Sequence, residues 1–283
     1  MSVYYDGFFL ANDGCRLYQR RWGEARQGVV VLIHGFGEHV GRYRFLVKML
    51  VDNGYEVFSY DARGHGRSEG PRGHIDSFQE YIQDLHVFLQ LVRDRIDPNK
   101  PLFLLGHSQG GHKVLRYGIQ YPHTPLQGII ASSPFLGMGK SISLGLRSLA
   151  RAMSVLRPSF SNPAGLNIAD LSHDQTIIEE TRKDTLYSNK ASARWYTETV
   201  KAHTETLKAA PRLHFPLLLQ MAGEERVVSK EAVFRFFEQV GSLNKRLIEY
   251  PGYFHEVYNE TPDRRGPVFA DLRAWMKEHS PQD

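Results

Sequence analysis

The sequence predicts an α/β fold in which helices cover both faces of a mainly parallel sheet. Short apolar runs of strand type alternate with segments whose apolar residues recur at helical spacing, both before residue 136 and after residue 210. Strands that alternate with helices form parallel sheets through crossover connections. The run at 29–33 is continuous and mostly β-branched, which is typical of a strand buried on both faces.

The composition allows one large domain and excludes several classes of protein. The chain has 283 residues, of which 41% are hydrophobic, enough for a sizeable core. Its net charge of +4 comes from scattered basic residues, so we expect no nucleic-acid partner. Cys15 is the only cysteine, which excludes an internal disulfide and fits a reducing, cytoplasmic environment. The start lacks a signal-peptide pattern, and no stretch approaches the ~20 apolar residues of a membrane span.

The elements follow in order along the chain. Residues 3–11 and 16–21 have strand character, and Asn-Asp-Gly between them is a strong hairpin signal. The elements expected up to residue 131 are strands at 29–33, 55–60, 102–105 and 127–131, with helices at 43–52, 77–95 and after residue 110. Those expected near the end are strands at 216–221 and 246–250, with helices at 230–240 and 267–279.

Between these two parts the alternation breaks. Residues 136–210 contain no clear strand, so we expect residues 1–135 and 211–283 to form the core and 136–210 to form an inserted helical cap. A helical apolar stripe runs through Ile142, Leu146, Leu149, Met153 and Leu156. The favoured interpretation is a helix packed on its own domain. The alternative is a lid that lines an acyl pocket or contacts a membrane peripherally.

The most informative stretch is Gly106-His107-Ser108-Gln109-Gly110. It follows a strand and precedes a helical pattern. In this context of strand, sharp turn and helix, Gly-x-Ser-x-Gly indicates a nucleophilic serine. Small residues at 106 and 110 would let the turn hold the Ser108 hydroxyl out at the carboxyl end of the strand. We expect Ser108 to be a nucleophile.

A serine nucleophile needs a base and an acid that orients the base. His255 lies between the last strand and the last helix, which favours it as the base. Glu225 follows the strand at 216–221 and precedes an apolar pair, which favours it as the acid, giving the order Ser, acid, His. The other carboxylates considered for this role are Glu224, Asp174, Asp184 and Asp263.

Attack on an acyl carbonyl produces an oxyanion, which two backbone N–H groups would stabilise. Gln109 directly follows the proposed nucleophile and would supply one donor. Phe36, between two glycines in the loop after residues 29–33, would supply the other.

Three segments, at 34–43, 61–70 and 106–111, resemble the monoacylglycerol lipase and lysophospholipase branch of the α/β-hydrolase superfamily, which includes proteins labelled serine aminopeptidases. The resemblance implies an α/β-hydrolase fold, a cap above the active site, an acyl-chain pocket, and no metal or organic cofactor. It supports the same site residues, namely Ser108, His255, Phe36 and Gln109. The family usually has Asp at the position of Glu225, and this chain departs from that pattern.

The sequence therefore predicts a serine hydrolase that cleaves carboxylic esters of lipid-like monoacyl substrates, such as monoacylglycerol or lysophospholipid. A short-chain carboxylesterase, a thioesterase or an aminopeptidase could use the same triad. An aminopeptidase also needs acidic groups near the site, and the cap offers Glu179, Glu180 and Asp184. The alternative outside enzymes is a ligand-binding module on a hydrolase fold.

Overall fold

The structure, a computed structural model, describes residues 5–139 and 143–280. Their main sheet contains β1 (Tyr5–Leu10), β2 (Arg16–Trp22), β3 (Gly28–Ile33), β4 (Tyr55–Tyr60), β5 (Leu102–His107), β6 (Gly128–Ser132), β9 (Leu217–Ala222) and β10 (Lys245–Tyr250). The longer helices are α1 (Arg44–Asp52), α2 (Phe78–Arg93), α3 (Gln109–Gln120), α4 (Leu144–Leu156), α5 (Gln175–Lys183), α6 (Ala193–Lys208), α7 (Lys230–Gln239) and α8 (Pro262–Glu278).

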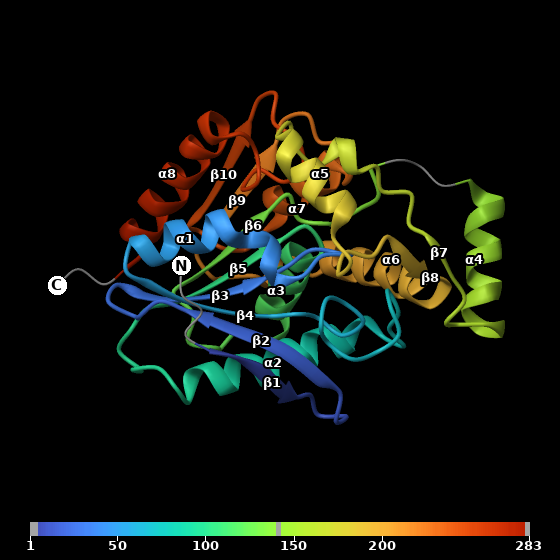
Figure 1. The fold of residues 1–283 in the computed structure, drawn as a ribbon, viewed down its shortest axis with the longest axis horizontal. Coiled ribbons are helices and arrows are strands. Elements are labelled where there is room, and N and C mark those ends of the chain that lie inside the picture. The colour runs from blue at the N-terminus through green and yellow to red at the C-terminus, as the bar shows by residue number, and fades with distance from the viewer. Residues whose placement is uncertain (1–4, 140–142, 281–283) are drawn as a thin grey trace.

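The sheet confirms the predicted α/β class. Its order is β1-β2-β4-β3-β5-β6-β9-β10, and all neighbours from β4 to β10 are parallel. The predicted hairpin is present as the antiparallel pair β1 and β2. Helices α1 and α8 cover one face of the sheet, and α2, α3 and α7 cover the other (Figure 1).

The strand at 29–33 shows how the sequence produces these layers. Val30 and Leu32 pack toward α1 and α8, whereas Val29, Val31 and Ile33 pack toward α2 and α3. Every side chain of β3 is buried because both faces of the strand are covered. Since parallel strands end at the same edge, the loops after β3, β5, β9 and β10 meet there.

The expectation that residues 136–210 contain no strand is wrong. Two short strands, β7 (Ser161–Pro163) and β8 (Lys190–Ser192), pair with each other in antiparallel fashion. Each is three residues long and lacks an apolar alternation, so its pairing depends on the tertiary structure and leaves no pattern in the sequence.

The apolar stripe forms α4, and this helix packs on α6 of the same segment as the favoured interpretation expects, but the stripe itself is not the packed face. Ile142 lies outside the described residues, and Leu146, Leu149 and Leu156 are all more than half exposed. The buried contact toward α6 is polar, with Ser154 Oγ 2.8 Å from Thr197 Oγ1. The helix forms because of its spacing, but spacing does not determine which face a neighbour covers.

The last helix also differs from the expectation, because α8 begins at Pro262 rather than Pro267. Pro262 stands in the first turn, where the missing N–H has no intrahelical partner to lose. Pro267 lies inside the helix. In the described part of the chain, no helix is long and apolar enough to cross a lipid bilayer.

The turn from β5 into α3 requires very close packing. Ser108 has a φ of 53° and a ψ of −118°, a conformation that costs a non-glycine residue free energy. A Cβ atom at position 110 would lie 2.1 Å from the Ile33 carbonyl oxygen, and one at position 106 would lie 2.3 Å from that of Gly110. The absence of side chains at 106 and 110 lets α3 begin directly against β3 and β5.

We predict that Gly110→Ala lowers the free energy of unfolding by about 3 kcal/mol or more, because its Cβ would collide with backbone atoms that cannot move independently. Gly266→Ala is the control, because a Cβ at 266 meets nothing within 4 Å and alanine favours a helix interior. Urea unfolding of both variants measures the difference. Equal stability of the two variants would contradict the close packing.

Candidate active site

Ser108 lies at the end of β5 and joins that strand to α3. Its amide donates to the Ser132 carbonyl oxygen at 2.9 Å, and its carbonyl oxygen accepts from the Phe135 amide at 2.9 Å. These bonds tie both sides of the turn to the chain that follows β6. Ser108 lines a cavity together with His255, so the structure places both residues at one site.

Glu225 and His255 contact each other directly. Nδ1 of His255 lies 2.8 Å from Oε2 of Glu225, and neither side chain is more than 3% exposed. The other Glu225 oxygen accepts from the amides of Val227 at 2.7 Å and Val228 at 3.1 Å. Because the carboxylate accepts the Nδ1 proton, Nε2 of the neutral imidazole is free to act as a base.

Electrostatics favour the charged forms of this pair. Burial alone would lower the pKa of His255, but the adjacent Glu225 carboxylate, together with Glu256 and Glu38, outweighs burial and raises that pKa. For Glu225, burial would raise the pKa, yet His255 and the two amides hold it below its ordinary value. Glu225 is therefore ionised at neutral pH and stabilises an imidazolium.

The other candidate carboxylates lie elsewhere. Glu224 is about half exposed and pairs with Arg226 at 3.2 Å. Asp174 caps the start of α5, and Asp184 bonds Nε2 of His39 at 2.7 Å. Asp263 is exposed at the start of α8. Of the five carboxylates considered in the sequence, Glu225 is the one that the structure places on His255.

Phe36 and Gln109 flank Ser108. Gln109 is the first residue of α3, so its amide has no acceptor within the helix. Phe36 lines the cavity beside Ser108, and the described residues provide no acceptor for its amide. Both amides are therefore available as donors, as the two-amide hypothesis requires.

The loop that carries Phe36 is anchored by groups to which the sequence analysis gave no role. Glu38 accepts from the Tyr43 hydroxyl at 2.5 Å and from the Gly35 amide at 3.3 Å. Burial and the nearby Glu256 raise the pKa of Glu38 to about 7. The Asp61 carboxylate also holds this loop, since it accepts from the Val40 amide at 2.8 Å.

A buried ion pair holds the His255 loop to the same region. Arg42 donates to both oxygens of Glu256, at 2.8 and 3.0 Å, and reaches Thr181 of α5 at 2.5 Å. Both charged side chains are nearly inaccessible to solvent. The sequence contained a signal for these two residues, because Arg42 lies in the segment 34–43 that carries the family resemblance and Glu256 directly follows His255.

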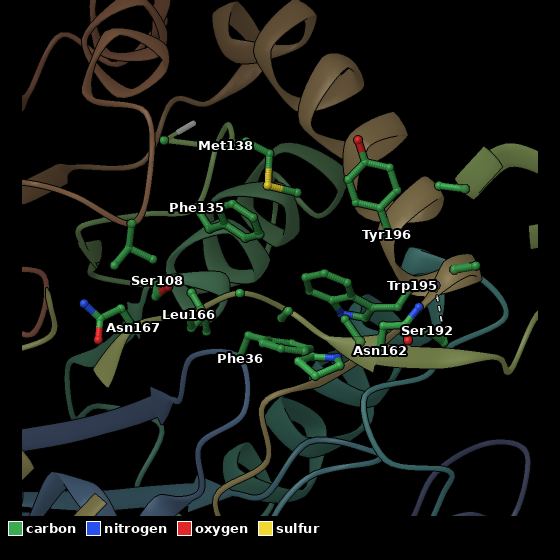
Figure 2. Close-up of a pocket in the computed structure, with 18 of the residues that line it drawn as sticks. Phe36, Ser108, Phe135, Met138, Asn162, Leu166, Asn167, Ser192, Trp195 and Tyr196 are labelled. Atoms are coloured by element: carbon green, nitrogen blue, oxygen red, sulfur yellow. Dashed lines mark hydrogen bonds between the residues drawn. The ribbon is translucent and has the colours of Figure 1, made fainter. Parts of the chain in front are cut away.

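Ser108 opens into an apolar cavity of about 430 Å³, a size suited to a small organic ligand. Figure 2 shows the aromatic rings of Phe36, Phe135 and Trp195 in the space between Ser108 and Tyr196. The apolar side chains that α4 contributes are Leu146, Leu149, Ala150 and Met153. The segment 136–210 therefore covers the site and supplies part of its apolar wall. Within residues 5–139 and 143–280 no group of three or more His, Cys, Asp or Glu side chains is arranged to hold a metal ion.

We predict that Glu225→Gln lowers the pKa of His255 relative to the wild type, because burial is then opposed only by the weaker effects of Glu256 and Glu38. An NMR titration of the His255 imidazole measures the change. Glu224→Gln is the matched control, since Glu224 lies outside the pair, and it should leave that pKa unchanged. An unchanged His255 pKa in Glu225→Gln would contradict the described coupling.

Comparisons with known proteins identify the family to which the chain belongs. The profile of the family described as "Serine aminopeptidase, S33" matches residues 24–262. "Phospholipase YtpA" from Bacillus subtilis is 36% identical over 89% of this chain and 95% of its own. "Monoacylglycerol lipase" from Mycolicibacterium smegmatis is 29% identical over 89% of each chain. The crystal structure of Paleococcus ferrophilus monoacylglycerol lipase has a TM-score of 0.85 at 29% identity and covers 93% of this chain and 99% of its own. The resemblance inferred from the three sequence segments is confirmed, and the chain belongs to the serine aminopeptidase S33 family of α/β-hydrolases.

Proposed function

We propose that this protein hydrolyses carboxylic esters of lipid-like monoacyl substrates, with Ser108 as nucleophile, His255 as base and Glu225 as orienting acid. The observation that carries the proposal is the buried Glu225–His255 pair at the same apolar cavity as Ser108. Lipid ester hydrolases are also what the names of the relatives describe, as monoglyceride lipases and a phospholipase.

The residues divide the reaction into two steps. His255 takes the Ser108 proton on Nε2 while the oxygen attacks the ester carbonyl, and the amides of Phe36 and Gln109 stabilise the oxyanion. The imidazolium then gives that proton to the leaving alcohol, which leaves an acyl-enzyme. In the second step His255 takes a proton from water, and the water oxygen attacks the acyl-enzyme carbonyl. His255 then returns the proton to the Ser108 oxygen as the fatty acid leaves. Glu225 holds the imidazole in the required tautomer throughout.

The cavity supports a monoacyl lipid as substrate. Its wall beside Ser108 is aromatic and aliphatic, as an acyl chain requires, and its polar lining includes Asn162, Asn167 and Tyr196. Monoacylglycerol and lysophospholipid each combine one acyl chain with a polar head group. Such substrates match this combination of apolar and polar surfaces better than a short-chain ester does.

The alternative that the protein is an aminopeptidase depends on acidic groups of the cap near the site. Glu180 pairs with Arg44, and Asp184 pairs with His39. Neither lines the cavity, and Glu179 does not line it either. The three cap acids considered in the sequence are therefore not part of the cavity wall. Asp170 of the same segment does line the cavity, but it pairs with Arg226 at 3.4 Å.

Peripheral membrane contact through α4, in a cytoplasmic protein, belongs to the same proposal. Leu144, Val155 and Leu156 are each at least 75% exposed, and they do not line the cavity. The exposed Arg147, Arg151 and Arg157 accompany them on the same segment. This pairing of apolar and basic side chains suits an anionic lipid surface, from which a monoacyl substrate would enter. In Figure 1, α4 stands at the outer end of the molecule.

The function is tested on a series of monoacylglycerols, lysophospholipids and p-nitrophenyl esters of increasing chain length. We expect activity to rise toward long chains, to vanish in Ser108→Ala, and to fall about 10³-fold or more in kcat in Glu225→Gln. Glu224→Gln, the matched control, should stay within about twofold of the wild type. Wild-type rates in Ser108→Ala, or activity on acetyl esters alone, would contradict the proposal.

The membrane contact is tested by co-sedimentation with phosphatidylglycerol vesicles. We expect the double variant Val155→Asp, Leu156→Asp to lose most binding, because it places charge on the apolar face. Leu243→Asp is the control, since Leu243 is 103% exposed on the core, away from α4. If the double variant binds as well as the control does, α4 is not the contact surface.

A further inference from the structure

Lys113 is a fully buried lysine on α3 that the proposed mechanism does not use. Its Nζ lies 3.9 Å from the centroid of the Tyr81 ring and has no hydrogen-bond partner among the described residues. Both polar atoms of the Gln109 side chain are equally buried and have no hydrogen-bond partner in the described part of the chain. Buried polar atoms are almost always paired, so this cluster is unusual.

The cluster includes Gln109, which is one of the two proposed oxyanion donors, and contacts between rings connect it to Phe36, which is the other. Gln109 and Lys113 are four residues apart on α3, so their side chains share one face, and helical side chains lean toward the helix start. Contacts between rings connect Tyr81 to Phe36 through His65. The centroid distances are 6.5 Å from Tyr81 to His65 and 5.4 Å from His65 to Phe36. Lys113 is therefore connected through packed side chains to both residues proposed as oxyanion donors.

No carboxylate neutralises Lys113. Asp84, on the neighbouring α2, is held by Arg63 through two bonds of 2.7 and 2.6 Å. Glu38 is held by Tyr43 and the Gly35 amide. A charge on Lys113 would therefore extend its field to the oxyanion loop instead of being cancelled locally.

Burial lowers the pKa of Lys113 to about 7, although Asp84 and Glu38 act in the opposite direction. Burial also lowers the pKa of the histidines around it, so that they are neutral at pH 7. These are His34 in the loop after β3, His65 in the loop after β4, His112 on α3 itself and His203 on α6. Arg116 of α3 is paired with Glu205 of α6 at 2.6 Å. Besides Lys113, Glu38 is the neighbouring group whose pKa lies near neutrality.

We propose that the Lys113 ammonium is a positioning residue for ester hydrolysis, whose field through Gln109 and the oxyanion loop favours negative charge on the substrate carbonyl oxygen. The inference rests on the proposed function, since it needs a developing oxyanion at the Phe36 and Gln109 amides. The proton stays on Nζ, and no bond to substrate forms. An unpaired buried cation acts in a medium of low dielectric constant, where such stabilisation is strongest.

The test is the pH profile of kcat/KM for monoacylglycerol hydrolysis, in the wild type and in Lys113→Met. The wild type should rise as His255 loses its proton and then fall on the alkaline side as Lys113 does. The variant should be slower by roughly fivefold at pH 7 and by less than twofold at pH 9, and it should lack the alkaline fall. Arg116→Met removes a paired cation from the same helix and should keep the fall.

Three outcomes overturn the inference while leaving the proposed function intact. The first is a wild-type activity that depends on Ser108 but shows no alkaline fall in kcat/KM. The second is an alkaline fall that persists in Lys113→Met, as it would if Glu38 were responsible. The third is an alkaline fall that is also lost in Arg116→Met. If the wild type hydrolyses no ester, the proposed function itself fails.

A second measurement is independent of catalysis. The unfolded chain holds the Lys113 proton up to its ordinary pKa of 10.5, whereas the folded chain releases it near 7. The unfolded state then binds more protons between these values, so the wild type should gain stability relative to Lys113→Met as the pH rises from 7 to 9. A urea midpoint difference that is constant over this range would show that the folded chain keeps the Lys113 proton as the unfolded chain does, which would contradict a desolvated, unpaired ammonium and overturn the inference.

Discussion

The active-site architecture depends on the close approach of α3 to the ends of β3 and β5. Ser108 adopts its positive φ only because the backbone on both sides carries no Cβ in the way, and the Ile33 carbonyl oxygen occupies that space. The same approach places the first residue of α3, whose amide has no acceptor within the helix, directly after Ser108, and Phe36 lines the cavity with Ser108. One steric condition therefore brings together Ser108 and the two residues proposed as oxyanion donors, and most of α3, including Lys113, is buried. Had α3 started farther from the sheet, none of these groups would share one site.

Charge burial is the second theme of the structure. Glu225, Glu38, Glu256 and Arg42 are all removed from solvent within the loops around Ser108. Each has specific partners, which is the condition under which buried charge is tolerated. The partners also connect the loops, because Arg42 joins the end of the Phe36 loop to the residue after His255 and to α5. Lys113 is the exception, because it is buried without such a partner. Burying Lys113 without such a partner lowers the stability of the fold, and a role in the reaction would explain why this cost is tolerated.

The segment 136–210 links the cavity to the surface. Its helix α4 turns some apolar residues toward the cavity and leaves others in solvent, so one short amphipathic element serves both surfaces. Contacts from this segment also reach the core loops, since the Ser188 amide donates to the Gly37 carbonyl oxygen at 2.9 Å. The covering segment and the Phe36 loop are therefore directly connected.

The sequence by itself determined the sheet, the order of its elements and the residues that follow each strand, because buried parallel strands and Gly-x-Ser-x-Gly leave strong local patterns. Parallel strands end at one edge, so the meeting of the Ser108, Glu225 and His255 loops follows from that order. The tertiary structure decided the rest. Whether Glu224 or Glu225 reaches His255 depends on a loop conformation in which one side chain points inward and the next outward, and no spacing encodes that. The pairing of β7 with β8, the exposure of the α4 stripe, and the isolation of Lys113 likewise depend on neighbours distant in the sequence, since burial and pairing are properties of the packed chain.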